Sequence, residues 1–249
     1  MKKFIFFFIL LFSFSLLVPR LVFASNVLLA DDFEDGMYDG WSVKSGTWNI
    51  ENISGSKRLG STVNSNQTVV EITAGDISWE DYVFEMDMIA LQGADKNIIF
   101  RVKDNNNKYG IHMRSNDGGV SELVCIERWS SKGGDVLSFW DKCRDWNFIN
   151  NKLYHLKVTA LNNNIKFYVD DVLAIDFTDE IAPIYNGKIG LRVGTGAVAP
   201  TEIYFDNVKV TKIRDPIVVI PGHGASINFQ EMFLGQDDPN GWQMVPGAH

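Results

Sequence analysis

An all-β fold, a jelly-roll sandwich of two antiparallel sheets, is predicted by three observations. From residue 26 to residue 213 apolar and polar residues alternate with a period of two, as half-buried strands require. No stretch keeps the apolar stripe of a helix for three turns. The connectors are short and rich in Asn and Gly. About ten short strands joined by hairpins, with no helices to cover a parallel sheet, predict two sheets packed face to face.

The clearest strand is Tyr82 to Ile89, where Phe84, Met86 and Met88 alternate with Glu85 and Asp87. One face of this strand should be buried and the other solvated. The same alternation predicts nine further strands: Gln67 to Thr73, Asn97 to Lys103, Lys108 to Arg114, Glu122 to Trp129, Leu153 to Leu161, Ile165 to Asp170, Val172 to Phe177, Lys188 to Val193 and Glu202 to Lys212.

Tight turns are predicted between consecutive strands. Asn, Asp and Gly tolerate the positive φ angle that short hairpins demand. Four connectors have this composition: Asp104 to Asn107, Asn116 to Gly119, Asn162 to Asn164, and Asp170 with Asp171. Most of the predicted strands should therefore pair with their neighbours in sequence.

Residues 1–24 have the features of a secretory signal peptide. Lys2 and Lys3 precede fifteen uncharged residues, and small residues end the segment at Ala24. The apolar run is short for a membrane span, so we expect no transmembrane segment after its removal. Without Lys2, Lys3 and Arg20 the formal charge is 20 − 31 = −11. Such an acidic surface argues against nucleic acid as a partner and leaves neutral glycans or cations compatible.

Cys125 and Cys143 are the only cysteines of the chain. In an exported protein an even number of cysteines favours a disulfide, with two buried thiols as the alternative. The two positions lie 18 residues apart. Closing a loop of this size would stabilise the fold by about 3 kcal/mol and would support one loop only.

Several short motifs occur in a characteristic order between residues 27 and 212. They are Asp32-Phe-Glu-Asp-Gly36 with Trp41, Ile99-Phe-Arg-Val-Lys-Asp104, Ile165-Lys-Phe-Tyr-Val-Asp-Asp171, Gly187-Lys-Ile-Gly-Leu-Arg192 and Tyr204-Phe-Asp-Asn-Val-Lys-Val210. This region resembles concanavalin A-like and laminin G-like jelly rolls, including the domain named for 3-keto-disaccharide hydrolases. The resemblance implies a sandwich of residues 25–213 that carries its ligand on a concave sheet.

A sugar site is predicted from aromatic and polar side chains. Sugar rings stack on aromatic planes, while their hydroxyls need hydrogen-bonding partners. If Phe100 and Val102 face the core, Arg101 points outward and is the best polar candidate. The other candidates are Tyr109, His112, Trp129 and Trp140, with core packing as the alternative role for each aromatic.

Glu85 and Asp87 begin the Glu-x-Asp-x-x-Glu pattern of laminarinase-type glycosidases, which share this fold. Retaining hydrolysis needs a second carboxyl group about 5 to 5.5 Å from the first. Ala90 occupies the position that should supply it. We therefore predict no catalytic residues within the 249 residues.

A structural Ca²⁺ is the cofactor that the resemblance implies, because such jelly rolls often join the first strand to the last through a cation. Asp32 and Glu34 would meet Asp206 if the first and last strands pair. Calcium takes six to eight oxygen ligands, including backbone carbonyls. Solvated turn carboxylates are the alternative.

Residues 214–249 differ in pattern from the sandwich. The continuously apolar run Ile217-Val-Val-Ile220, followed by Pro-Gly-His-Gly, resembles the first strand and oxyanion loop of lipase- and esterase-type α/β-hydrolases. The resemblance places Gly222 and His223 in that loop and predicts the truncated start of an α/β domain. A Gly-x-Ser-x-Gly elbow does not occur in the 249 residues.

Three functions compete: a sugar-binding module that would direct a hydrolase to a glycan surface, a structural or adhesion sandwich, and a sugar-acting enzyme. An exposed aromatic near Arg101 would favour the first, and a concave face of aliphatics only would favour the second. Two facing carboxylates, one with a raised pKa, would favour the third. The expected location in each case is secreted or at the cell surface.

Overall fold

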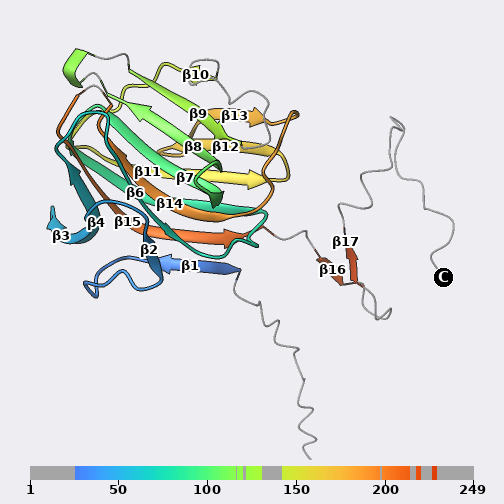
Figure 1. Ribbon diagram of the computed structural model, residues 1–249. Coiled ribbons are helices and arrows are strands. Elements are labelled where there is room, and N and C mark those ends of the chain that lie inside the picture. The colour runs from blue at the N-terminus through green and yellow to red at the C-terminus, as the bar shows by residue number, and fades with distance from the viewer. Residues whose placement is uncertain are drawn as a thin grey trace, which may run out of the picture.

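A computed structural model describes residues 26–115, 117–119, 122–130, 142–196 and 198–213, and the backbone of 217–219 and 226–228. The predicted signal peptide lies outside these residues. Within them the chain forms strands and one turn of 3₁₀ helix, Asp117–Gly119. The strands build two antiparallel sheets that pack face to face (Figure 1). The predicted all-β sandwich is confirmed.

One layer is an eight-stranded sheet in the order β13-β12-β11-β6-β15-β4-β3, with β1 beside β15. Its strands are β1 (Val27–Asp31), β3 (Asn49–Ile53), β4 (Ser56–Val63), β6 (Tyr82–Gln92), β11 (Leu153–Leu161), β12 (Asn164–Val169), β13 (Val172–Thr178) and β15 (Thr201–Lys212).

The other layer is a seven-stranded sheet in the order β10-β9-β8-β7-β14-β5-β2. Its strands are β2 (Trp41–Val43), β5 (Val69–Ala74), β7 (Asp95–Asp104), β8 (Asn107–Arg114), β9 (Leu123–Trp129), β10 (Cys143–Arg144) and β14 (Lys188–Gly194). We call the side of this sheet that faces away from the other layer its outer face.

The predicted alternation produces the core. Phe84, Met86 and Met88 are fully buried between the sheets, whereas Glu85 and Asp87 lie on the other side of β6. The side chains of β14 follow the same rule, with Leu191 and Val193 in the core and Arg192 on the outer face. Burial of so many apolar side chains is the main stabilising term of the sandwich.

The predicted hairpins are confirmed at three of the four connectors. The turns at Asn162, Asp170 and Asp171 contain residues with positive φ angles of 51°, 49° and 63°. At the third connector the ladder pair Asp104 with Asn107 closes the β7–β8 hairpin. Part of the connector between β8 and β9 lies outside the described residues.

β3 and β4 were missed by the sequence analysis because β4 contains few apolar residues. Its Gly60 has no side chain because the ring of Tyr204 occupies the space, and a Cβ there would lie 2.3 Å from Tyr204 Cδ1. Ser61 donates a hydrogen bond to the carbonyl of Thr47. The strand is thus built from close backbone approach and polar contacts, which leave no period-two pattern in the sequence.

Arg101 is the main correction to the predicted orientations. The β7–β8 register pairs Phe100 with Tyr109 and then Asp104 with Asn107, so three residues of β7 oppose one residue of β8. Arg101 lies in this bulge with a φ angle of 47°. A bulge interrupts the alternation of side chains. The expected outward orientation is wrong, and Arg101 is fully buried.

The interior contains a polar network at the Arg101 end of the sandwich. Arg101 donates to the carbonyls of Ile184 and Asn162, and it forms an ion pair with Asp81 at 3.2 Å. Nearby, Asp179 forms an ion pair with Arg128 at 2.7 Å and accepts a hydrogen bond from the Tyr109 hydroxyl at 2.6 Å.

Asp179 remains ionised at neutral pH within this network. Burial opposes ionisation, but hydrogen bonds from Tyr109 and Arg128 lower the pKa of the Asp179 carboxyl. The same carboxylate accepts hydrogen bonds from the backbone N–H groups of Ile181 and Ala182. The network therefore attaches the segment after β13 to strands of the other sheet.

The predicted disulfide is confirmed. Cys125 on β9 is bonded to Cys143 on β10, and the two residues are direct partners in the strand ladder. Because β10 has only two residues, the covalent bond fixes a strand that backbone hydrogen bonds would hold weakly.

In the C-terminal region the structure describes two short strands, β16 (Ile217–Val219) and β17 (Ser226–Asn228), which pair antiparallel. The predicted strand is therefore present at Ile217, and its described partner runs antiparallel. Gly222 and His223 lie outside the described residues, so the hydrolase assignment stays a prediction.

Candidate functional site

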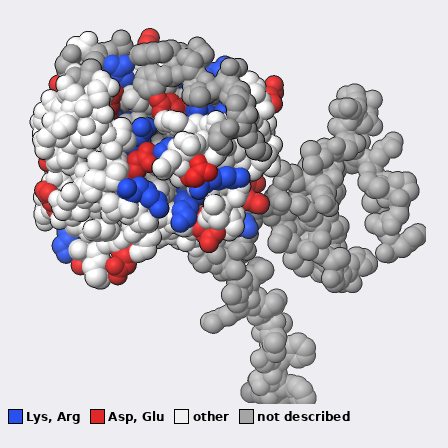
Figure 2. All heavy atoms as spheres, viewed as in Figure 1, with Lys and Arg blue, Asp and Glu red and all other residues white. Residues whose placement is uncertain are grey.

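Charged side chains gather on the outer face of the seven-stranded sheet. They alternate along the strands with core residues such as Tyr109, Ile111 and Leu191. On the face of the domain presented in Figure 2, basic and acidic side chains are intermingled in the middle. The residues of this charged face are Glu71, Asp95, Lys108, His112, Arg114, Glu127, Trp129 and Arg192.

Four of these side chains form what we call the ion-pair layer: Glu71, Lys108, Glu127 and Arg192. Lys108 Nζ lies 2.8 Å from Glu71 Oε1, and Arg192 Nε lies 3.2 Å from the same oxygen. Arg192 also reaches Glu127 at 3.8 Å. The layer connects β5, β8, β9 and β14 through side chains alone.

Trp129 lies against the two cations of the layer. Lys108 Nζ is 5.3 Å from the centre of its ring, and Arg192 Cζ is 5.1 Å from it, within cation–π range. The indole extends over Gly110 of the neighbouring strand, where a Cβ would lie 2.8 Å from Trp129 Cζ3. Glycine at position 110 therefore lets the indole lie close to the sheet.

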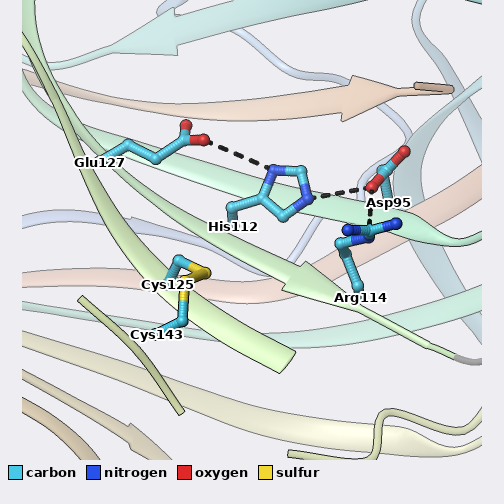
Figure 3. The surroundings of a disulfide bond; sticks show 6 residues. All are labelled: Asp95, His112, Arg114, Cys125, Glu127 and Cys143. Carbon is cyan, nitrogen blue, oxygen red and sulfur yellow. Dashed lines mark hydrogen bonds and ion pairs between the residues drawn. A yellow bond between two sulfur atoms is a disulfide. The ribbon is translucent and has the colours of Figure 1, made fainter. Parts of the chain in front are cut away.

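His112 lies between two carboxylates on the same face (Figure 3). Its Nε2 is 2.9 Å from Asp95 Oδ1, and its Nδ1 is 3.8 Å from Glu127 Oε1. Arg114 approaches Asp95 at 3.5 Å. Burial raises the pKa of the Glu127 carboxyl, although nearby His112 and Arg192 act in the opposite direction.

Two side-chain oxygen atoms on this face are buried with no hydrogen-bond partner among the described residues. They are the Oδ1 atom of Asn97 and the Oγ1 atom of Thr73, in residues that are 4% and 1% exposed. Buried polar atoms are usually hydrogen-bonded, and leaving one unpaired is costly. These two oxygens therefore mark positions where a polar ligand or water would be stabilised.

The structure brings together only part of the predicted sugar site. His112 and Trp129 share the charged face, whereas Tyr109 and Arg101 are buried in the interior network and are not accessible at the surface. Trp140 lies outside the described residues. Successive residues of β8 face opposite sides of the sheet. Because Lys108 lies on the outer face, Tyr109 faces the core.

Five charged residues of the face were missed: Glu71, Asp95, Lys108, Glu127 and Arg192. Three of them, Glu71, Glu127 and Arg192, each lie next to a core residue in their strand. This alternation could have predicted that their side chains point outward. Their convergence depends on the strand order β9-β8-β7-β14-β5, which joins segments far apart in the sequence.

The predicted calcium ligands are partly brought together. β1 pairs with β15, as expected, and the Ser56 hydroxyl lies 2.7 Å from both Glu34 Oε1 and Asp206 Oδ2. Asp32 instead accepts a hydrogen bond from the N–H of Glu34. Among the described residues no group of three or more His, Cys, Asp or Glu side chains could hold a metal ion. Calcium binding stays a prediction.

The Glu85 and Asp87 pair lies on the eight-stranded sheet, away from the charged face. Asp87 accepts a hydrogen bond from Asn207 and lies 2.9 Å from His155 Nδ1. Ala90, at the position of the missing acid, is buried. The pair is therefore a partnered cluster on the side of β6 that faces away from the core.

Residues 30–211 match the family described as the 3-keto-alpha-glucoside-1,2-lyase-like domain. The chain belongs to this family. A protein of Methanocaldococcus jannaschii described as uncharacterized is 28% identical over 180 residues, which cover 70% of this chain and 72% of that protein.

Among solved structures, the carbohydrate binding module CBM66 from Bacillus subtilis is 25% identical, with a TM-score of 0.53, and the match covers 70% of this chain and 96% of that one. A beta-glucanase from Bacillus licheniformis is 16% identical, with a TM-score of 0.53, over 74% of this chain and 98% of that one. The latter likeness shows the fold alone. No helix in the described part of this chain is long and apolar enough to cross a membrane.

Proposed function

We propose that this protein is an exported domain that binds a neutral glycan on the outer face of its seven-stranded sheet. The observation that carries the proposal is Trp129, a half-buried indole that contacts Lys108 and Arg192 on the outer face, where Glu127 pairs with Arg192. Sugars suit such a face, because their C–H faces stack on aromatic planes while their hydroxyls bind carboxylate and amide groups. The similarity to a carbohydrate binding module supports the same conclusion.

A neutral ligand is favoured by the balance of charge on the face. Lys108, Arg114 and Arg192 are matched by Glu71, Asp95 and Glu127, so there is no excess of cations to attract an acidic polymer. The disulfide between Cys125 and Cys143 agrees with an oxidising, extracytoplasmic location. A purely structural sandwich is less well supported, because its outer face was expected to carry aliphatic side chains.

Binding can be tested by isothermal titration calorimetry with the alpha-glucosides trehalose and maltohexaose and with a glycan array. We expect saturable binding that Trp129→Ala weakens by at least about tenfold, a loss of about 1.4 kcal/mol. Tyr168→Ala, on the eight-stranded sheet beside Lys157, is the matched aromatic control. Absence of binding to every glycan would contradict the proposal.

A sugar-acting enzyme is the second candidate, and a specific observation favours it. Asp95 and Glu127 face opposite nitrogens of His112, and the pKa of Glu127 is raised. Two facing carboxylates, one of them with a raised pKa, are the arrangement expected to favour this candidate. In the reaction the family description suggests, the 3-keto group acidifies the C2–H bond. A base removes that proton, the C1–O bond breaks, and an acid protonates the departing oxygen.

In this candidate reaction His112, held by Asp95, would take the proton, and Glu127 would supply one to the leaving group. Incubation with 3-keto-trehalose should then release one glucose and one unsaturated 3-keto sugar, detectable by chromatography. Glu127→Gln should abolish release while retaining binding. Binding without any release, by the unaltered protein, would leave the binding module as the function.

Delivery of an appended hydrolase to a glycan is a further part of the proposal. It rests only on the sequence of residues 217–226 and its resemblance to an oxyanion loop. Reading the gene beyond codon 249 tests it, since a Gly-x-Ser-x-Gly elbow would be required.

A further inference from the structure

The ion-pair layer crosses the outer face in two opposite directions. Lys108 starts on β8 and reaches Glu71 on β5, passing over β7 and β14. Arg192 starts on β14 and reaches Glu127 on β9, passing over β7 and β8. The two long side chains therefore lie over the same central strands, and both contact the indole of Trp129.

Two glycines lie beneath these crossing side chains. Gly110 and Gly190 are the ladder partners of Ile99, one on each side of it. A Cβ on Gly190 would lie 2.9 Å from Ile99 Cγ1. Ile99 belongs to the outer face by its alternation with Ile98 and Phe100, yet it is fully buried. Its ladder partner Gly110 lies beneath the indole of Trp129, which contacts both cations of the layer.

The surface beneath the layer is polar on both sides of Ile99. Asn97, two residues earlier on β7, pairs with Arg192 in the ladder, and Thr73 pairs with Gly190. Their Oδ1 and Oγ1 atoms have no hydrogen-bond partner among the described residues. The layer thus covers hydrogen-bonding atoms that it does not satisfy, which is an unfavourable arrangement for a permanent structural contact.

We propose that the ion-pair layer is a displaceable cover over the sugar site, and that Asn97 and Thr73 form the surface that receives sugar hydroxyls when Lys108 and Arg192 move aside. The inference rests on the proposed function. The ligand is a neutral sugar ring, which takes the place of the two cations against Trp129. Its hydroxyls satisfy the orphaned oxygens and the carboxylate of Glu71.

A cover of this kind lowers the apparent affinity, because only the open fraction of molecules can bind. Glu71 is the residue that holds both cations, so Glu71→Gln should raise the open fraction while preserving shape. Lys108→Met should act in the same direction, because it keeps the length of the side chain and removes the charge. Sodium chloride should tighten the binding of a neutral sugar by weakening the ion pairs.

The test is calorimetric titration of trehalose, or of maltohexaose if only that probe binds, into the intact protein at low and high salt. We expect Glu71→Gln and Lys108→Met to bind about fivefold more tightly than the unaltered protein at low salt, and the difference to shrink at high salt. Asp171→Asn, which breaks an ion pair with Lys157 on the eight-stranded sheet, is the matched control. It should leave affinity unchanged.

If both variants bind sugar no more tightly than the unaltered protein, with an unchanged melting temperature, the proposal of a displaceable cover is wrong. Acrylamide quenching of Trp129 fluorescence, obtained by difference from Trp129→Phe, gives a readout that needs no sugar. Glu71→Gln should increase that quenching, and unchanged quenching would also overturn the cover. If the unaltered protein binds no sugar, the proposed function fails, and the quenching result alone decides whether the layer opens.

Discussion

Two networks of charged residues occupy the two sides of the seven-stranded sheet. On the inner side, Asp179 contacts Arg128, Tyr109 and two backbone N–H groups, and Arg101 donates to backbone carbonyls. On the outer side, the ion-pair layer joins long side chains to one another. The inner pair of Arg128 and Asp179 is 0% and 1% exposed, whereas the outer pair of Arg192 and Glu127 keeps side-chain exposures of 18% and 10%.

The difference teaches that residue type does not identify a binding site. Arg101 and Arg192 are both arginines on strands of the same sheet, but one is fully buried against carbonyl groups and the other is the ladder partner of Asn97, whose Oδ1 has no partner among the described residues. In the interior network the Nη atoms of Arg101 have partners, and only its Nε has none among the described residues, so the network stabilises the fold. A surface network that covers unsatisfied groups is better suited to binding.

The largest expected effect is on the interior network. Asp179→Ala removes the counter-ion of Arg128 and the acceptor of Tyr109, and should lower the free energy of unfolding by about 3 to 5 kcal/mol. Urea denaturation followed by fluorescence measures this. Asp176→Ala, which breaks an exposed ion pair with Lys166, is the control and should cost less than about 1 kcal/mol. An equal loss of unfolding free energy in the two variants would contradict the expected difference between buried and exposed charges.

Removal of the disulfide should affect both stability and the outer face. Cys125 lies opposite His112 in the β8–β9 ladder, two residues from Glu127. The double variant Cys125→Ser with Cys143→Ser should lose about 3 kcal/mol of unfolding free energy. It should also bind sugar more weakly, because the bond restrains β9. Loss of stability with unchanged affinity would mean that the disulfide supports only the loop.

Lys96 provides a pH test of the interior side. Its ammonium lies within 3.3 Å of two carbonyls and the Ser115 hydroxyl, and burial lowers its pKa to about 8 from 10.5. Between these values the unfolded chain binds more protons, so stability rises with pH. The free energy of unfolding should therefore increase between pH 8 and pH 10, and Lys96→Met should reduce this increase by about 2 kcal/mol. Urea denaturation at the two pH values measures it. An unchanged slope would contradict the lowered pKa.

The smallest expected effect comes from one methyl group on the outer face. Gly110→Ala places a Cβ 2.8 Å from Trp129 Cζ3, so the indole must tilt away from the sheet. We expect sugar affinity to fall by about threefold. Gly60→Ala on β4 is the matched control, since its Cβ would crowd the ring of Tyr204 in the eight-stranded sheet, away from the charged face. Equal affinity in the two variants would show that the position of the indole is unimportant.

Much of the fold could be predicted because strands and hairpins leave local patterns. The predicted strand Leu153 to Leu161 has the same boundaries as β11 in the structure. The Asn and Asp turns were predicted because these residues tolerate positive φ angles. The candidate site was less accessible. His112 and Trp129 were identified, but Glu71 and Arg192 were missed because they lie on β5 and β14, far from β8 and β9 in the sequence.

The sequence by itself determined the fold class, the covalent link and the outward direction of most strand side chains, since each depends on neighbours in the chain. The tertiary structure decided which outward side chains meet, because the order β9-β8-β7-β14-β5 joins distant segments through backbone hydrogen bonds. It also decided the place of Arg101. One bulge in β7 reversed the local alternation and moved this charge from the predicted sugar site into the core.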